Sequence, residues 1–316
     1  MNLNEIILNN YQIRKTYKQK TQFINFLENR YKNIPITIEK SGKLIKNRNI
    51  IIGDFKHADI VYSAHYDTCA FSFVPNMMFK SKILFVLYQI IFLTIFCFVS
   101  YILTVVLKLL IRPADVLLLL YLVWGTLLYQ LMFGIKNNHT ANDNTSGVLT
   151  ILYAIDKIIK VNGTIPKNIC FVLFDNEEKG LIGSQRMKTI HKTDDKIFFN
   201  FDCVGNGNNL ILFYKKPMKN NKIFNEFYNK AKNISPSHFD TSSKKLNSLM
   251  LSSDHIVFKN SIGIATFKKN KIFKFLYVPR LHTPLDTKYS LKNIKYLSNI
   301  IYNFAINIES GYTDNE

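Results

Sequence analysis

Seven side chains along the chain belong to the two donor types that divalent zinc prefers, imidazole nitrogen and carboxylate oxygen. Each of them follows a short apolar run or stands near the start of a helical stretch. They are His65, Asp67, Asp143, Glu177, Glu178, Asp202 and His282. Carboxylates that would repel one another as a bare cluster become favourable around two divalent cations. The residue types therefore indicate a metal centre, provided that the fold brings them together.

The elements that must position these side chains alternate between short apolar runs and helical stretches. This alternation predicts an α/β domain with a central mixed β-sheet flanked by helices. We expect strands at 49–52, 60–64, 170–174, 198–202, 210–214, 262–267 and 273–278. We expect helices at 16–31, 147–161, 181–190, 222–232 and 291–308. Because loops at the carboxyl ends of strands converge on one crevice in an open α/β sheet, the seven side chains can meet there.

Taken singly, each motif has an ordinary structural interpretation. A His-x-Asp sequence at a strand end, such as His65 and Asp67, is most often a hydrogen-bonded loop. The pair Glu177-Glu178 before a helix is most often a solvated first turn that matches the helix dipole. The occurrence of several such motifs, each directly after a predicted strand or at a helix start, favours a site.

The longest apolar block of the chain lies outside this pattern. Its first part, 83–107, has 25 residues without a charge, and its second part, 116–135, has 20 more. At about 1.5 Å per residue, either part as a helix is long enough for the ~30 Å hydrocarbon core of a bilayer. Core helices of soluble proteins are usually shorter and amphipathic. We therefore expect two membrane spans joined by a short turn.

The two spans would form a transmembrane hairpin within a single domain. No internal repeat or low-complexity linker separates the flanking segments, so the hairpin interrupts one domain and does not join two. The expected division is 1–79 and 138–316 for the domain, with the hairpin at 80–137.

Charge predicts the orientation of the hairpin. Lys80, Lys82 and Lys136 lie at its outer ends, against Lys108 and Arg112 at its tip. The positive-inside rule then places the domain in the cytoplasm, and the N-terminus shows no secretory leader that would export it. We expect an integral membrane protein with two spans and a cytoplasmic domain.

Composition excludes other classes. The net charge of +19 is spread along all 316 residues, without the localised basic stripe that nucleic-acid binding needs, so we expect no nucleic-acid partner. The cysteines form no C-x-x-C pair and indicate small buried side chains in a reducing compartment, not a disulfide framework or a thiolate metal site. They are Cys69, Cys97, Cys170 and Cys203. The sequence gives no indication of an oligomeric state.

The motifs resemble those of the M28 zinc peptidases, a family that includes bacterial aminopeptidases and the glutaminyl cyclases. The similar stretches occur in the family's order and cover the chain from about residue 49 to 308, apart from the hairpin. They are IVYSAHYDT, ANDNTSGV, FVLFDNEEKGLIGSQ, FNFDCVG, SDHIVFKNSIGIATF and LHTPLDT. The resemblance implies a zinc-exopeptidase-like fold.

The resemblance also implies a ligand set for two zinc ions per chain. Asp143 would bridge the ions, with His65 and Asp202 completing one site and Glu178 and His282 completing the other. It further implies a cis peptide bond after Asp143.

The remaining roles follow from the same resemblance. Glu177 would be the general base for a water shared by the ions. Asp67 would orient His65, Asp286 would do the same for His282, and Asp254 would support the pocket. The other histidines match no ligand position. They are His57, His139, His191, His238 and His255.

The implied function is that of a membrane-anchored aminopeptidase, which hydrolyses the N-terminal residue from a peptide with a free N-terminus. A glutaminyl cyclase with one zinc is the first alternative, although the peptidase versions of the motifs are present and no aromatic residue follows Glu178 closely. A receptor-like member without catalysis is the second, although all ligand positions are filled. The chain departs from the family in the insertion of about 70 residues between Asp67 and Asp143. This insertion places the membrane near the crevice, where we expect the hairpin to act as an anchor.

Overall fold

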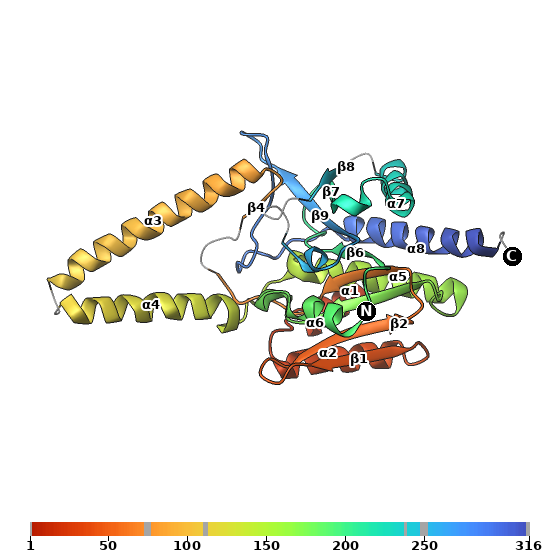
Figure 1. Cartoon of the computed structure of the whole chain (residues 1–316), viewed down its shortest axis with the longest axis horizontal. Helices are drawn as coiled ribbons and strands as arrows, with labels where there is room; N and C mark the ends of the chain where they lie inside the picture. The colour runs from red at the N-terminus through yellow and green to blue at the C-terminus, as the bar shows by residue number, and fades with distance from the viewer. Residues whose placement is uncertain (1, 73–76, 110–112, 237–238, 247–251, 314–316) are drawn as a thin grey trace.

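A computed structural model describes residues 2–72, 77–109, 113–236, 239–246 and 252–313. The molecule consists of an α/β body and of a two-helix arm that projects from one side of it (Figure 1). Two residues named above, Arg112 and His238, lie outside the described residues.

The body is organised around one mixed sheet, whose described part has ten strands. They are β1 (Ile36–Ser41), β2 (Asn47–Gly53), β3 (Ile60–His65), β4 (Met78–Phe79), β5 (Ile169–Phe174), β6 (Ile197–Phe201), β7 (Asn209–Tyr214), β8 (Asp240–Lys245), β9 (Ser261–Lys269) and β10 (Leu276–Val278). Their order is β1-β2-β5-β3-β6-β9-β10-β4, and β7 pairs with both β8 and β9. The central strands β5, β3, β6 and β9 are parallel, and β2 and β10 run antiparallel to their neighbours. The strand β7 is antiparallel to β9 and parallel to β8.

Helices cover both faces of the sheet. They are α1 (Leu3–Asn10), α2 (Tyr17–Arg30), α5 (Ser146–Asn162), α6 (Ile182–Ile190), α7 (Lys222–Asn233) and α8 (Leu291–Thr313). The larger core packs α1, α2, α5, α7 and α8 against one face, whereas Met187 of α6 and Phe258 pack against the other. Every residue of β3, β5 and β6 is buried, as expected for parallel strands covered on both sides.

The predicted α/β class and the central mixed sheet are confirmed, and most predicted elements lie within a few residues of the observed ones. One strand prediction was too long, because only Leu276–Val278 of 273–278 is extended. Phe273 instead lies in a turn with 76% of its surface exposed. The helix α1 and the strands β1, β4 and β8 were not predicted.

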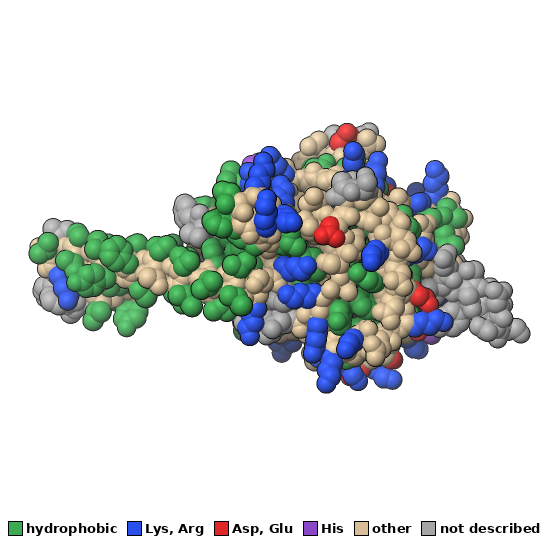
Figure 2. All heavy atoms as spheres, turned by 90° about the horizontal axis from the view of Figure 1, so that it is seen from above, with side chains coloured by type: hydrophobic (Ala, Val, Ile, Leu, Met, Phe, Trp, Pro, Cys, Tyr) green, Lys and Arg blue, Asp and Glu red, His purple; other side chains and the backbone are tan. Residues whose placement is uncertain are grey.

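The arm consists of α3 (Lys82–Lys108) and α4 (Pro113–Phe133), and we call residues 82–133 the apolar arm. Its helices leave the body separately and converge toward the tip (Figure 1). Phe96 and Trp124 join them, with ring centroids 3.7 Å apart. None of the residues of α3 is buried, although the helix is strongly apolar. Apolar side chains cover most of the arm, and Lys and Arg side chains gather on the body where the arm joins it (Figure 2).

One described helix is long and apolar enough to cross a membrane. It is α3, with a mean hydropathy of 2.7 in its most apolar window, none of which is buried. The apolar segment of α4, Asp115–Gln130, is shorter. The sequence predicted two spans, so one of them meets the length criterion in the structure and the second stays a prediction.

Backbone bonds fix both feet of the arm to the body. Before α3, β4 pairs with β10 through Tyr277 and Phe79. After α4, Lys136 forms a bridge with Ala70. The strand β3, which precedes β4 and the arm in the chain, pairs directly in parallel with β5, which follows the arm. The body is therefore continuous across the arm.

Candidate metal centre

The carboxyl edge of the parallel strands gathers the predicted site residues. His65 ends β3, Asp202 directly follows β6, and Glu177 and Glu178 follow β5 by way of a two-residue turn. Because β3, β5 and β6 are parallel neighbours, their carboxyl ends lie at the same edge. The register pairs His65 with Phe174, so the strands end level with one another.

Asp143 reaches this edge from a short kinked turn, η1 (Ala141–Thr145), directly before α5, in which Asp143 and Asn144 have non-helical backbone angles. The peptide bond between Asp143 and Asn144 is cis, which confirms the prediction from the sequence. Asn144 holds the turn against β6, since its side-chain amide donates to the Phe201 carbonyl at 2.9 Å. At Gly147 a Cβ atom would lie 2.3 Å from that same carbonyl oxygen, so only glycine allows this approach.

Two sets of donor atoms meet at Asp143. In the first set, His65 Nε2 lies 3.4 Å from Asp143 Oδ1 and 3.7 Å from Asp202 Oδ1. In the second set, His282 Nε2 lies 3.1 Å from Asp143 Oδ2 and 3.2 Å from Glu178 Oε2. The structure thus brings together all five residues predicted as ligands. Asp143 contributes one oxygen to each set.

The turn that carries Glu177 and Glu178 is held by Asp67. This turn, η2 (Glu177–Lys179), is a 3-10 helix, and its first two amides donate to the Asp67 carboxylate at 3.0 Å and 3.3 Å. His65 Nδ1 lies 3.2 Å from the Asp67 carbonyl oxygen and 3.7 Å from its carboxylate. Asp67 therefore contacts both the His65 ring and the turn with the two glutamates.

Asp286 has a different partner from the one expected. Its carboxylate accepts from the backbone amides of Asn142 at 3.0 Å and of Asp143 at 2.9 Å. Asp286 interacts electrostatically with His282, but no hydrogen bond to the His282 ring occurs among the described residues, so the orientation of His282 by Asp286 stays a prediction. Asp286 instead positions the turn that carries Asp143. His282 itself has a left-handed backbone, with φ 60°, in the loop after β10.

The electrostatics of the cluster reflect its burial. Burial raises the pKa of Glu177 well above its usual range and raises that of Glu178 to about 8. Burial acts to raise the pKa of Asp143 as well, but hydrogen bonds with His282 and His65 lower this pKa by a larger amount. The net pKa of Asp143 therefore lies well below its usual range. For His282, burial lowers the pKa and the Glu178 carboxylate raises it, with a net value of about 9. The protein alone therefore leaves several carboxylates competing for few positive charges.

The donor set fits zinc. Ligand oxygens and nitrogens at ~2.0–2.2 Å from a tetrahedral zinc lie roughly 3.3–3.6 Å apart, close to the spacing within both sets. Glu178 Oε1 and Asp202 Oδ1 are buried and have no hydrogen-bond partner among the described atoms. An unpaired buried carboxylate costs several kcal/mol, which a bound cation would offset. These residues can therefore hold divalent cations.

Two buried cations behind the site were missed from the sequence. The Arg14 guanidinium donates to the Tyr66 carbonyl and, at 3.2 Å, to the Thr145 hydroxyl, so it links the His65 strand to the Asp143 turn. Lys20 forms a buried ion pair with Asp175, just before the glutamates. Both come from the N-terminal segment, where a single basic residue carries no recognisable sequence signal.

None of the other described histidines belongs to a group of donor atoms that could hold a metal ion. His57 pairs with Asp54 on the surface, and His191 pairs with Glu39. His255 is fully buried in the short helix η4 (Asp254–Val257), where burial lowers its pKa to about 3. Asp254 in the same turn is also buried, and burial raises its pKa to about 7.

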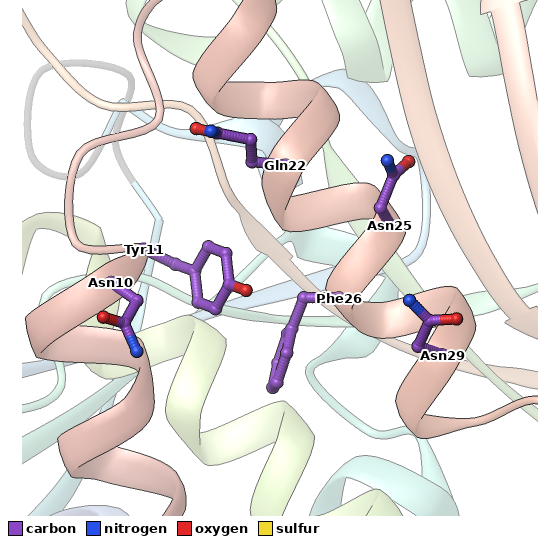
Figure 3. A pocket seen from close by; sticks show the side chains of 6 residues that line it. All are labelled: Asn10, Tyr11, Gln22, Asn25, Phe26 and Asn29. Carbon is purple, nitrogen blue, oxygen red and sulfur yellow. The ribbon is translucent and has the colours of Figure 1, made fainter.

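A separate shallow pocket of about 430 Å³ lies between α1 and α2 (Figure 3). Its lining is made of amide and aromatic side chains. These are Asn10, Tyr11, Gln22, Asn25, Phe26 and Asn29. It contains no carboxylate, imidazole or thiol, so it cannot offer the donor set found at the edge of the sheet.

Comparison with known proteins agrees with the fold. The model of peptidase family M28 matches residues 129–304. The structure is similar to a glutaminyl cyclase from Porphyromonas gingivalis, with a TM-score of 0.61, 16% identity and coverage of 96% of this chain and 95% of that one. It is similar to a Zn-dependent exopeptidase from Parabacteroides distasonis, with a TM-score of 0.58, 14% identity and coverage of 95% and 94%. The aminopeptidase LapA from Legionella pneumophila gives a TM-score of 0.56, 15% identity and coverage of 96% and 67%. No match was found among curated proteins.

Proposed function

The chain belongs to peptidase family M28, and on that premise we propose that it is a zinc-dependent aminopeptidase that removes the N-terminal residue from peptides. One observation carries the proposal. Asp143 presents one carboxylate oxygen to His65 and Asp202 and the other to Glu178 and His282. Such an arrangement suits two ions that share one carboxylate.

In this reaction each residue of the site would have a separate role. Bound zinc supplies Lewis-acid polarisation of the scissile carbonyl. Glu177 accepts the proton of the attacking water and passes it to the leaving amine, as a general base and then a general acid. Asp67 positions the Glu177 turn and the His65 ring through the contacts described above. The excess of carboxylates also favours the α-ammonium group of a peptide with a free N-terminus.

A glutaminyl cyclase is the second candidate, because solved cyclases share the fold. Both reactions start from a free N-terminus but release different products. We would incubate the purified chain with a panel of aminoacyl and dipeptidyl amides and with peptides that begin with glutamine, and would count zinc per chain. Released amino acids with two zinc ions support the aminopeptidase. Released ammonia and a blocked N-terminus with one zinc ion would instead make it a cyclase.

We further propose that the apolar arm crosses the membrane as a hairpin, separate from a catalytic domain at 1–79 and 138–316. The length of α3 supports one span. The 21 residues of α4 would reach about 31 Å at the usual helical rise, enough for a second. The cytoplasmic orientation is supported by the lysines at the outer ends of the arm.

Cysteine labelling tests this topology. Cys97 is exposed, so it is first replaced by Ser. Single cysteines are then placed at two exposed positions, Lys108→Cys at the tip of the arm and Lys167→Cys on the body. An impermeant thiol reagent should label the tip in intact cells and the body only after permeabilisation. Labelling of the body with protection of the tip would reverse the orientation. Labelling of both sites in intact cells would exclude the hairpin.

A further inference from the structure

Two adjoining hollows of about 360 Å³ each open at the foot of α4. Four side chains line both of them: Lys15, Tyr17, Phe133 and Lys179. Lys136 completes one hollow and Arg48 lines the other. We call these two hollows the foot pocket. The foot pocket lies where the apolar arm meets the body, and none of its lining residues belongs to the donor sets of the metal centre.

Carboxylates at the metal centre attract Lys15 and Lys179 electrostatically but form no described salt bridge with them. Within the described ranges, no salt bridge involves Lys15, Lys136 or Lys179. Asp175 lines one hollow, but its carboxylate is bound to Lys20 and to the Arg48 amide. Lys15 Nζ donates to the Met132 carbonyl at the end of α4, at 3.1 Å. An ammonium has three N–H donors, so this bond leaves Lys15 able to bind an anion as well.

The neutral part of the lining is aromatic and apolar. Phe133, at the last turn of α4, is 42% exposed and Tyr17 is 58% exposed. The Lys179 ammonium lies 5.8 Å from the centre of the Phe133 ring. Leu44, which lines the second hollow, is 99% exposed. Aromatic rings beside lysines at the end of an apolar helix are typical of the interface between bilayer and water.

We propose that the foot pocket binds the phosphate of an anionic phospholipid, with its acyl chains lying along α4. The inference rests on the proposed insertion of the apolar arm, which sets the pocket at the depth of the headgroups. Lys15, Lys136 and Lys179 supply the charge for the phosphate. Phe133, Tyr17 and Leu44 supply an apolar surface that a freely soluble phosphate would not use. The combination therefore favours a lipid.

The foot pocket is also coupled to the metal centre by the chain itself. Lys179 is the last residue of η2, the same turn that carries Glu177 and Glu178. A phosphate bound to Lys179 therefore contacts the turn that presents both glutamates. Bound anionic lipid would therefore restrain this turn.

Native mass spectrometry of the full chain in a neutral detergent tests the inference. Dissociation constants would be measured for short-chain phosphatidylglycerol, for phosphatidylcholine with the same chains, and for inorganic phosphate. The test variant is Lys15→Gln/Lys136→Gln/Lys179→Gln. The control is Lys32→Gln/Lys160→Gln/Lys167→Gln. It removes three exposed lysines, of which one lies just after the end of α2 and two lie near the end of α5. Both variants lose the same net charge.

We expect phosphatidylglycerol to bind more tightly than phosphatidylcholine. Its affinity should fall roughly fivefold for each lysine removed and on the order of 100-fold in the test variant, with little change in the control. Lys136→Gln alone keeps the measurement informative if the triple variant does not fold. Equal binding of the two lipids, or equal loss in test and control variants, would overturn the inference. Inorganic phosphate that binds as tightly as phosphatidylglycerol would do so too, because the site would then recognise free phosphate.

Alkaline carbonate extraction of membranes separates this inference from the one on which it rests. A chain that stays in the washed membranes but shows no preference for phosphatidylglycerol contradicts only the lipid site. A chain that is washed out contradicts the insertion of the arm and the lipid site together.

Discussion

The metal centre and the apolar arm place opposite kinds of side chain in opposite surroundings. At the edge of the sheet, charged groups are withdrawn from water, and Asp143, Asp202 and His65 are all less than 6% exposed. Along α3, none of the residues is buried, yet most are apolar. Bound cations would compensate the charge of the first region, and a bilayer would cover the apolar surface of the second. The chain therefore has one region with buried charge that the protein does not balance and another with apolar surface that the protein does not cover.

The largest expected effect tests the catalytic side of this comparison. Replacing Glu177 by Gln keeps the size of the side chain but removes the proton acceptor. We expect turnover to fall by about 10²–10⁴, with unchanged zinc content and melting temperature. Glu226→Gln, at an exposed position of α7, is the control and should leave turnover unchanged. Near-normal turnover in a Glu177→Gln chain with full zinc would refute the role of this residue.

A matched pair of phenylalanines tests the comparison through stability. Phe198 in β6 is fully buried and stacks on Phe258 at 3.7 Å, whereas Phe98 in α3 is 64% exposed. Truncation of a buried phenylalanine leaves a cavity, so Phe198→Ala should lower the free energy of unfolding by about 3–5 kcal/mol. Phe98→Ala should change it by less than about 0.5 kcal/mol, because the side chain packs on no core. Urea titration in a mild detergent gives both values. Similar losses would show that the arm packs against protein.

The smallest expected effect concerns the support of the metal ligands. Asp67→Asn keeps the shape but weakens acceptance from the η2 amides and the contact with His65. Loss of such supporting groups typically lowers metal affinity about 10–100-fold. Competition with a zinc chelator measures this, with Asp59→Asn in the exposed loop before β3 as the control. A zinc affinity equal in the two variants would mean that Asp67 only shapes the loop.

The sequence predicted the central strands well because they are continuous apolar runs bounded by polar residues. It missed β8, whose sequence DTSSKK is polar and which pairs only with β7 at the border of the sheet. Edge strands bury little surface, so their residues need no apolar pattern. The strand β4 has two residues and forms only through its partner β10. Neither strand has a local signal that separates it from a loop.

The site was predictable to the extent that its residues come from strand ends. His65, Asp202, Glu177 and Glu178 follow apolar strands, and Asp143 precedes a helix. Arg14 was not predictable, because its contacts with Tyr66 and Thr145 join segments 52 and 131 positions away. The actual partners of Asp286 also depend on how two loops meet. Such contacts are set by tertiary packing and leave no trace in local spacing.

The backbone bonds at both feet of the arm have a mechanical consequence. One foot is paired to β10 and the other to Ala70, while the Ser72 amide donates to the His282 carbonyl at 2.7 Å. Two attachments restrict rotation of the arm relative to the body more than a single flexible linker would. If the arm spans the bilayer, the crevice stands at a fixed height above the lipid surface. The distance between the bilayer and the crevice would then select substrates. Another membrane-bound chain would be cut only if the segment between its N-terminus and the bilayer were long enough to reach the crevice.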